Sequence, residues 1–284
     1  MTRALAAALP RPAFLGEVAK LPAFLRRDFL VAWSYRVGFF SDIASLIAQM
    51  LVFFFIGKMI DSSSLPEYGG VHPSYLEFVT IGVVLNAFVQ VALSRTADAL
   101  RTEQMIGTLE ALMTTPTATA TIQLGSAVFD LVYMPLRLVV FLVFMTVAVG
   151  IDVEISGGLP SLVVLIAFLP FVWGLGLAAA AAILTFRRGG GVIAVGTMLL
   201  GLASGAFFPL DLLPAWIAAA AEYNPLAIAI EGFRDALLGG TGWSGVGDHL
   251  VLLFPISTLS IIGGSVLFHL ALSRERRRGT LGLY

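Results

Sequence analysis

The chain has 284 residues, of which 58% are hydrophobic and only 12% charged, and its formal net charge is −1. The hydrophobic share exceeds the roughly 45 to 50% apolar residues of soluble domains. The mean hydropathy is correspondingly high, at +0.93. An integral membrane protein is therefore expected. A soluble helical bundle is disfavoured, because its helices would carry polar stripes at the helical period. The chain has no cysteine, which excludes disulfides and thiolate metal sites.

Residues 1–36 are expected to form a cytoplasmic tail that ends in an amphipathic connecting helix. The stretch MTRALAAALPRPAFLG contains an apolar run that Pro10 and Pro12 interrupt. This run is too short for the core of a signal peptide. We therefore expect the N-terminus to be retained on the cytoplasmic side.

Six apolar stretches are long enough to be membrane helices, since a span needs about 20 mostly apolar residues. These stretches are 37–60, 75–93, 131–150, 160–186, 191–208 and 250–272. Together they predict an all-α integral membrane protein with six transmembrane helices over residues 37–272.

The Lys and Arg residues predict the orientation, because cytoplasmic loops carry an excess of them. With the N-terminus inside, fourteen of the 17 basic residues fall on the cytoplasmic side. These fourteen are Arg3, Arg11, Lys20, Arg26, Arg27, Arg36, Arg95, Arg101, Arg187, Arg188, Arg274, Arg276, Arg277 and Arg278. Lys58 and Arg234 are then outside and Arg137 lies within a span. Both termini, including the basic tail 273–284, are expected in the cytoplasm.

The cytoplasmic loop between the second and third spans, residues 94–124, contains a predicted amphipathic helix over 97–113. Its apolar residues recur at spacings of three to five, and Pro116 ends it. One interpretation is a helix that lies on the lipid headgroups. Its polar face is acidic and amide-bearing, however, and the inner leaflet is anionic, so a cytoplasmic protein partner is favoured. Gly107 within this helix indicates a bend or a close backbone approach, although a merely tolerated glycine is the alternative.

Polar residues inside the spans are expensive and usually face a bundle interior. Asp42, Ser45 and Gln49 share one stripe of the first span. Asp42 and Arg137 enter from the cytoplasmic side to similar depth, so they could form a buried pair. The alternative is that Arg137 extends to the headgroups while Asp42 faces a pathway. The small residues at 174–182 favour close packing within the chain.

The segment 209–240 between the fifth and sixth spans mixes prolines, acids and apolar runs that are too short to cross a membrane. Pro209 and Pro214 are expected to break the helix after the fifth span. Irregular backbone at membrane depth must be covered by protein or line a cavity. We expect an extracellular re-entrant hairpin that acts as an outer gate, with a simple surface cap as the alternative.

Three motifs in order resemble one known family. The pattern Glu103-x-x-x-Gly107-Thr108-Leu109-Glu110-x-Leu112-x-x-x-Pro116 is similar to the cytoplasmic coupling region of permease subunits of type-2 ABC exporters, which include bacterial drug, lipid and polysaccharide export permeases. Residues 24–36 (FLRRDFLVAWSYR) resemble the connecting helix of that family. Residues 204–237 resemble its re-entrant hairpin, which ends at the Asn224-Pro225 step.

The resemblance implies a subunit that dimerises and recruits two copies of a separate P-loop ATP-binding cassette subunit, which binds ATP and Mg²⁺. It also implies that this chain holds no cofactor and no metal and has no catalytic residue. It implies too that the chain carries no nucleotide site, and the sequence supports this point independently, because it lacks the Gly-x-x-x-x-Gly-Lys-Ser/Thr loop that cradles phosphates. By the same resemblance, the ATPase-coupling contact consists of Arg26, Arg27, Asp28, Glu103, Gly107, Thr108, Leu109 and Glu110. A homodimer in the bacterial plasma membrane is expected, with a heterodimer left open, and no nucleic-acid partner is expected.

The substrate implied by the resemblance is an amphipathic small molecule or a lipid, with a lipid-linked glycan as the alternative. A membrane enzyme is disfavoured because the sequence has no His-Glu-x-x-His and no Gly-x-Ser-x-Gly. An ion-coupled secondary transporter is disfavoured because no internal repeat is evident.

Overall fold

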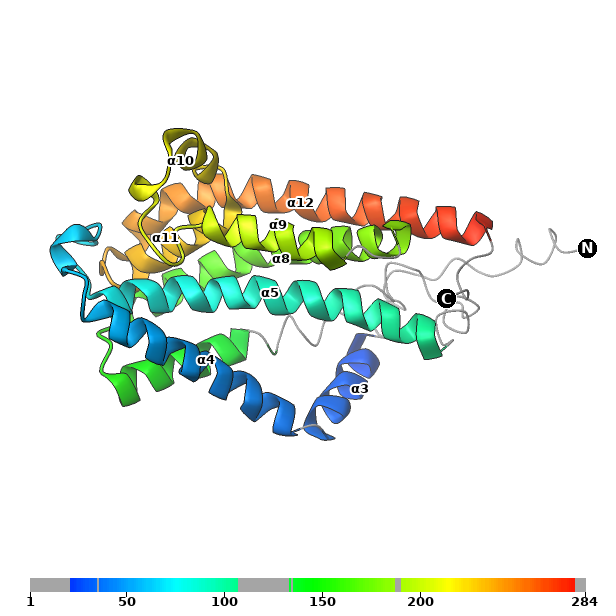
Figure 1. Ribbon diagram of the computed structural model, residues 1–284, viewed down its shortest axis with the longest axis horizontal. Coiled ribbons are helices and arrows are strands. Elements are labelled where there is room, and N and C mark those ends of the chain that lie inside the picture. Colours follow the sequence, from blue (N-terminus) through cyan, green and yellow to red (C-terminus); the bar gives the residue numbers. More distant parts are fainter. Residues whose placement is uncertain (1–20, 35, 107–132, 134, 187–189, 279–284) are drawn as a thin grey trace, which may run out of the picture.

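The described part of the chain comprises residues 21–34, 36–106, 133, 135–186 and 190–278 of a computed structural model. In this part every regular element is helical, apart from one isolated bridge between Tyr68 and Val71. The long helices lie along the longest axis of the molecule (Figure 1). They are α4 (Arg36–Gly57), α5 (Tyr75–Ile106), the helix Pro135–Val149, α8 (Gly158–Phe186), α9 (Gly190–Leu202) and α12 (Gly242–Arg278).

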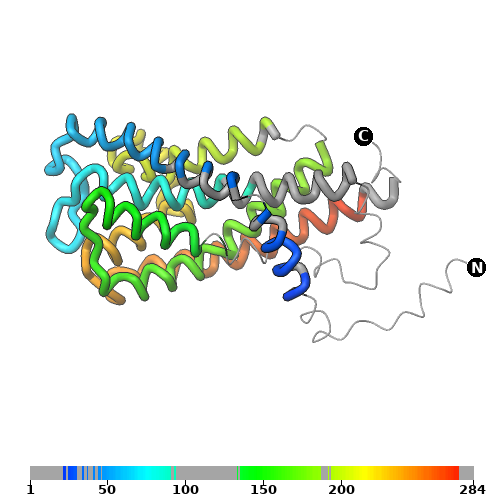
Figure 2. The backbone as a smooth tube through the Cα atoms, turned by 90° about the horizontal axis from the view of Figure 1, so that it is seen from below, coloured from blue at the N-terminus to red at the C-terminus, as the bar shows by residue number. Residues whose placement is uncertain are grey.

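The two ends of the bundle differ. At the end drawn on the left of Figure 1 lie two short helices, α10 (Ala215–Ala221) and α11 (Pro225–Leu237). We call this the outer end, and the opposite one the inner end. At the inner end α5 and α12 finish, and α3 (Leu21–Ser34) is set at a steep angle to α4, outside the long helices (Figures 1 and 2).

Each expected apolar stretch contains a helix, but several boundaries differ. The fifth helix, α9, ends at Leu202 and not at 208, because the chain turns at Gly205, whose φ of +69° favours glycine. The sixth helix, α12, begins at Gly242, eight residues before the expected start. Two helices, Ile155–Phe186 and Gly242–Arg274, are long and apolar enough by themselves to cross a membrane. The others have shorter apolar cores: Ile47–Gly57, Tyr75–Gln90, Pro135–Val149 and Ile193–Leu202.

The packing centres on α8, which runs beside α12. A side chain added at Gly174 would collide with the backbone of Ser260, and one at Gly264 would collide with the backbone of Gly174. Small residues thus bring the two helices into backbone contact, as the sequence predicts for this part of the fourth span. The core continues to α5 and α11 through buried side chains such as Phe168 and Ile230.

Two side chains, Ser74 and Glu77, fix the start of α5 at the outer end. Ser74 and Glu77 form a capping box: the Glu77 carboxylate accepts the Ser74 N–H at 2.7 Å, and the Ser74 hydroxyl accepts the Glu77 N–H at 3.3 Å. The second Glu77 oxygen accepts the N–H of Asp152 at 3.2 Å. One side chain therefore caps α5 and holds the loop that precedes α8.

Candidate functional site

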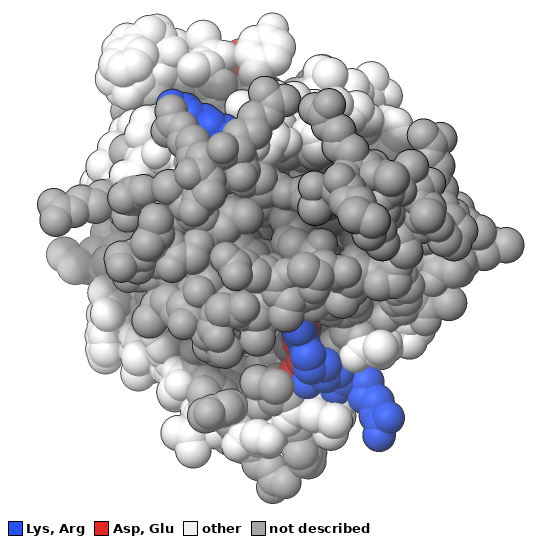
Figure 3. All heavy atoms as spheres, turned by 90° about the vertical axis from the view of Figure 1, so that its right-hand side faces the viewer, with Lys and Arg blue, Asp and Glu red and all other residues white. Residues whose placement is uncertain are grey.

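The inner end carries the described part of the expected coupling contact. Arg26 and Arg27 are exposed on α3, and the Arg27 Nε donates to Asp28 Oδ1 at 2.7 Å. Arg274, near the end of α12, is also exposed. Figure 3 shows this end, with Lys and Arg side chains at two separate places on it and acidic side chains beside one of them. Exposed arginines such as Arg26 and Arg27 can form ion pairs with a soluble partner.

The coupling segment of the second loop is only partly described. Helix α5 continues without a break from Tyr75 to Ile106. The described part of the helix expected over 97–113 is therefore helical, but it is continuous with the second span and not separated from it by a loop. The reason is that 94–106 has strong helix formers and neither Gly nor Pro. Glu103 lies in this extension, near its end. Gly107, Thr108, Leu109 and Glu110 lie outside the described residues.

The polar residues of the spans separate into two kinds. Ser45 and Gln49 are exposed on α4, so these two side chains face away from the bundle of their own chain. Arg137 is buried, with 8% of its surface exposed. The side chain of Asp42 lies outside the description, and its pairing with Arg137 stays a prediction.

Pro209 and Pro214 were expected to break the helix after the fifth span, but α9 ends at Leu202, before either proline. Pro209 precedes a short 3₁₀ helix, Leu210–Leu212, and Pro214 precedes α10. Each proline sits where its missing N–H leaves no helical hydrogen bond unmade. The α10 helix projects from the bundle (Figure 1).

Asn224 and Pro225 begin α11 and connect it with α9. The Asn224 Oδ1 accepts the Leu226 N–H at 3.0 Å, which is an N-cap, and Pro225 occupies the first turn. The Asn224 Nδ2 donates to the carbonyls of Leu200 at 3.1 Å and Ala203 at 2.8 Å. These carbonyls lie at the C-terminal end of α9, where helices leave acceptors unpaired. Asn224 therefore caps the start of α11 and donates to carbonyls at the end of α9.

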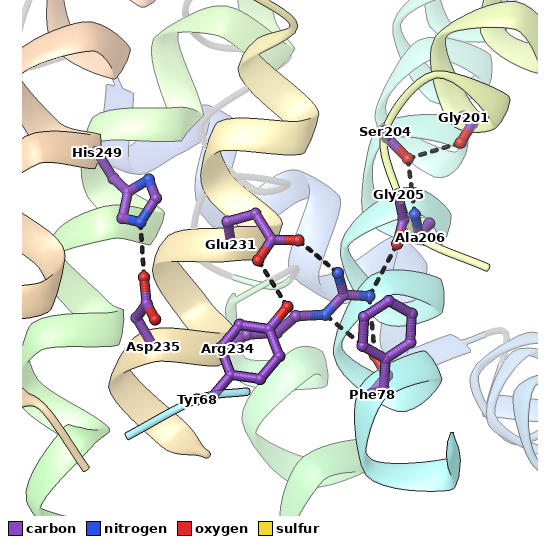
Figure 4. A network of polar contacts seen from close by, with 10 residues as sticks. All are labelled: Tyr68, Phe78, Gly201, Ser204, Gly205, Ala206, Glu231, Arg234, Asp235 and His249. Atoms are coloured by element: carbon purple, nitrogen blue, oxygen red, sulfur yellow. Dashed lines mark hydrogen bonds and ion pairs between the residues drawn. The ribbon is translucent and has the colours of Figure 1, made fainter. Parts of the chain in front are cut away.

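Arg234 on α11 is the largest fully buried side chain in the described residues, with 0% exposure. Its Nε and Nη2 donate to the Phe78 carbonyl of α5 at 3.2 and 3.0 Å. Nη2 also donates to the Gly205 carbonyl at 2.9 Å, and the guanidinium lies 3.5 Å from the centre of the Phe78 ring (Figure 4). One side chain thus contacts the backbone of two other elements.

The charge of Arg234 is balanced by Glu231, one turn earlier on α11. Arg234 Nη1 donates to Glu231 Oε1 at 2.7 Å, and the Tyr68 hydroxyl donates to Glu231 Oε2 at 2.7 Å. Burial raises the pKa of the Tyr68 phenol above its ordinary value, so Tyr68 remains a donor. The next residue of α11, Asp235, points away from Arg234 and contacts His249 of α12 at 2.7 Å (Figure 4).

Comparison with known protein families identifies the family of this chain. The family model described as ABC-2 type transporter matches residues 20–238. The chain belongs to this family. A comparison with curated proteins finds no match. The protein is accordingly an ABC-2 permease, a membrane component of a transport system, and members of this family are generally not catalytic.

In this ABC-2 permease the match runs from the start of α3 to the end of α11, so it includes both the residues expected to form the coupling contact and the Arg234 contacts. Reasoning from sequence missed Arg234, which was counted only as an outer basic residue. The available signal was the spacing of Glu231 and Arg234, three residues apart in a mostly apolar helix. Such spacing places both charges on one face.

A pocket of about 680 Å³ opens at the outer end beside α5 and the loop before α8. Its lining includes His72, Glu77, Asp152 and Glu154. Among the described residues, no three acidic, His or Cys side chains are placed to hold a metal ion.

Proposed function

We propose that this ABC-2 permease is the transmembrane subunit of an ATP-driven exporter, forms the pathway as a homodimer and is driven by two copies of a separate ATP-binding subunit. The observation that carries the proposal is the family match over residues 20–238. That match covers the Arg26-Arg27-Asp28 patch, in which both arginines are exposed, and the Glu103–Glu110 motif.

The polar stripe of α4 supports the dimer. Ser45 and Gln49 lie about 14 and 20 Å along the helix from Arg36, close to the middle of a membrane helix. Exposed polar groups at this depth are unfavourable in lipid. A second copy of the chain, or a water-containing pathway between two copies, would remove this penalty.

Helix α5 supplies a physical route for coupling. It has 32 residues, which corresponds to about 48 Å from the outer to the inner end. Its last turns lie next to the coupling motif, and its first turns contact Arg234. A displacement produced by an ATPase at Glu103 could therefore reach the outer segment through one continuous helix.

The proposed substrate is an amphipathic small molecule or a lipid, because the Gly107-Thr108-Leu109-Glu110 sequence resembles that of the drug and lipid branch of the family. Export of a lipid-linked glycan is the second candidate, and an ion-coupled secondary transporter is the third. The proposed location is the bacterial plasma membrane, with both termini in the cytoplasm.

The proposal is tested by purifying the tagged chain in mild detergent from its own membranes and identifying the proteins that accompany it. A P-loop ATPase is expected with the wild type and not with the Gly107→Trp, Glu110→Arg double variant. A matched control is Gly158→Trp, Glu222→Arg, which makes the same changes at exposed outer positions and should retain the ATPase. Loss of the ATPase from both double variants, or its absence from the wild type, would contradict the coupling assignment.

A further inference from the structure

The buried guanidinium of Arg234 is the point where separate parts of the outer end are joined. Phe78 belongs to α5, Gly205 to the turn that follows α9, and Glu231 to α11 itself. Through Glu231 the connection extends to Tyr68, in the segment between α4 and α5. The guanidinium is fully buried and its hydrogen bonds to the two carbonyls are buried with it, whereas the Glu231 carboxylate is partly exposed. Charge-assisted hydrogen bonds in such a buried place are stronger than exposed equivalents.

The turn after α9 is also held by close backbone packing. A side chain at Gly82 of α5 would collide with the backbone carbonyl of Ala206. The buried Ser204 hydroxyl donates to the Gly201 carbonyl at 2.6 Å and accepts the Ala206 N–H at 3.2 Å (Figure 4). Farther along, the Tyr75 hydroxyl donates to the Phe207 carbonyl at 3.0 Å. The turn therefore has few ways to shift without breaking buried hydrogen bonds.

The next segment, residues 209–223, has a different character. Leu212, Trp216 and Tyr223 are 74%, 76% and 69% exposed. The main contact of α10 is with the adjacent 3₁₀ helix, Leu210–Leu212, of the same segment. Few buried contacts and an exposed surface are properties of regions that open at low free-energy cost.

We propose that Arg234 joins the first turns of α5, the turn 203–208 and α11 into one rigid unit, the Arg234 block, and that residues 209–223 are the part of the outer gate that moves relative to it. The gating part rests on the proposed function; the rigidity does not. Separating Arg234 from its partners would leave a charge buried and unpaired, which is strongly unfavourable. Gate opening therefore leaves the Arg234 contacts intact, and the block moves with α5.

The test is hydrogen exchange, followed by mass spectrometry, on the full chain in lipid nanodiscs without any ATPase. In the wild type, the amides of 203–208 should exchange as slowly as those of α11, and those of 210–223 at least about 100-fold faster. Comparable rates in 203–208 and 210–223 would overturn the proposal, and this comparison needs no variant.

Variants assign the rigidity to the guanidinium. Arg234→Met should accelerate exchange in 203–208 by about 100-fold or more, while the contact of α8 with α12 around Gly174 stays protected. Arg234→Lys should give an intermediate acceleration, because one ammonium cannot reproduce the fork of donors. The control Arg274→Met changes an exposed arginine at the inner end and should leave 203–208 unchanged.

Unchanged protection of 203–208 in Arg234→Met would refute the role of the side chain. If the methionine variant does not fold, Glu231→Gln, which preserves shape, should still accelerate the same amides. Absence of an ATPase from the purified protein would refute the proposed function and would leave the Arg234 block in place.

Discussion

At the scale of single residues, Asn224 connects the end of α9 with the start of α11. Asn224→Ala should lower the free energy of unfolding by about 2 kcal/mol, because it removes a helix cap and leaves two carbonyls without their donor. Asn224→Asp should lose less, since it retains the cap but not the amide donor. The measurement is thermal unfolding in detergent. The control is Asp61→Ala, which removes an exposed cap and should change stability by less than about 1 kcal/mol; an equal loss in both alanine variants would contradict the double role of Asn224.

A second residue-scale prediction concerns Asp42 and Arg137. If they pair, Asp42→Asn and Arg137→Gln should each destabilise the protein by about 3 kcal/mol, and the double variant should recover part of this loss. The readout is thermal unfolding of all three variants, with the exposed Lys58→Gln as a control that should have little effect. A double variant no more stable than either single variant would remove the support for the pair.

At the scale of elements, the contact of α5 with the turn 203–208 depends on Gly82. Gly82→Ala should destabilise the protein by about 2 kcal/mol or more, because the added carbon meets the Ala206 backbone and neither element can yield easily. Gly196→Ala in α9 is the matched control: no atom lies within 4 Å of the added carbon, so a gain of up to about 1 kcal/mol is expected from helix propensity. The check is the difference in unfolding free energy, and a harmless Gly82→Ala would show that the turn is not fixed by this contact.

Element types followed well from the sequence, and some boundaries did not. Runs of apolar residues are enough to place helices, and the prolines at 209 and 214 mark the starts of two short helices. The early end of α9 depends on the positive φ of Gly205. A glycine within an apolar run does not by itself predict such a turn. The continuation of α5 to Ile106 failed to be predicted because polarity was read as a loop, whereas a helix can extend beyond the membrane.

The parts of the candidate site that depend on neighbouring residues could be predicted from the sequence. The parts in which distant segments meet could not. The Asn224-Pro225 step reads as a helix start from its residues alone. The Arg234 contacts join positions as far apart as Phe78, 156 residues away. No local pattern specifies such a partner, so only the spacing of Glu231 and Arg234 could have been noticed.

At the scale of the whole molecule, the orientation rests on the distribution of Lys and Arg. The cysteine-free chain allows a clean test with single cysteines at Ser63, exposed at the outer end, and Arg274, exposed at the inner end. A membrane-impermeant maleimide should label Ser63→Cys on intact cells, and Arg274→Cys only after permeabilisation. The opposite pattern would reverse the orientation.

The central claim is that this ABC-2 permease works as a dimer with an external source of ATP energy. The most direct measurement is native mass spectrometry of the assembly released from its own membranes. The predicted result is two copies of the 284-residue chain with two copies of a P-loop ATPase. A chain that is released alone and still moves solute under an ion gradient would contradict the claim and favour a secondary transporter.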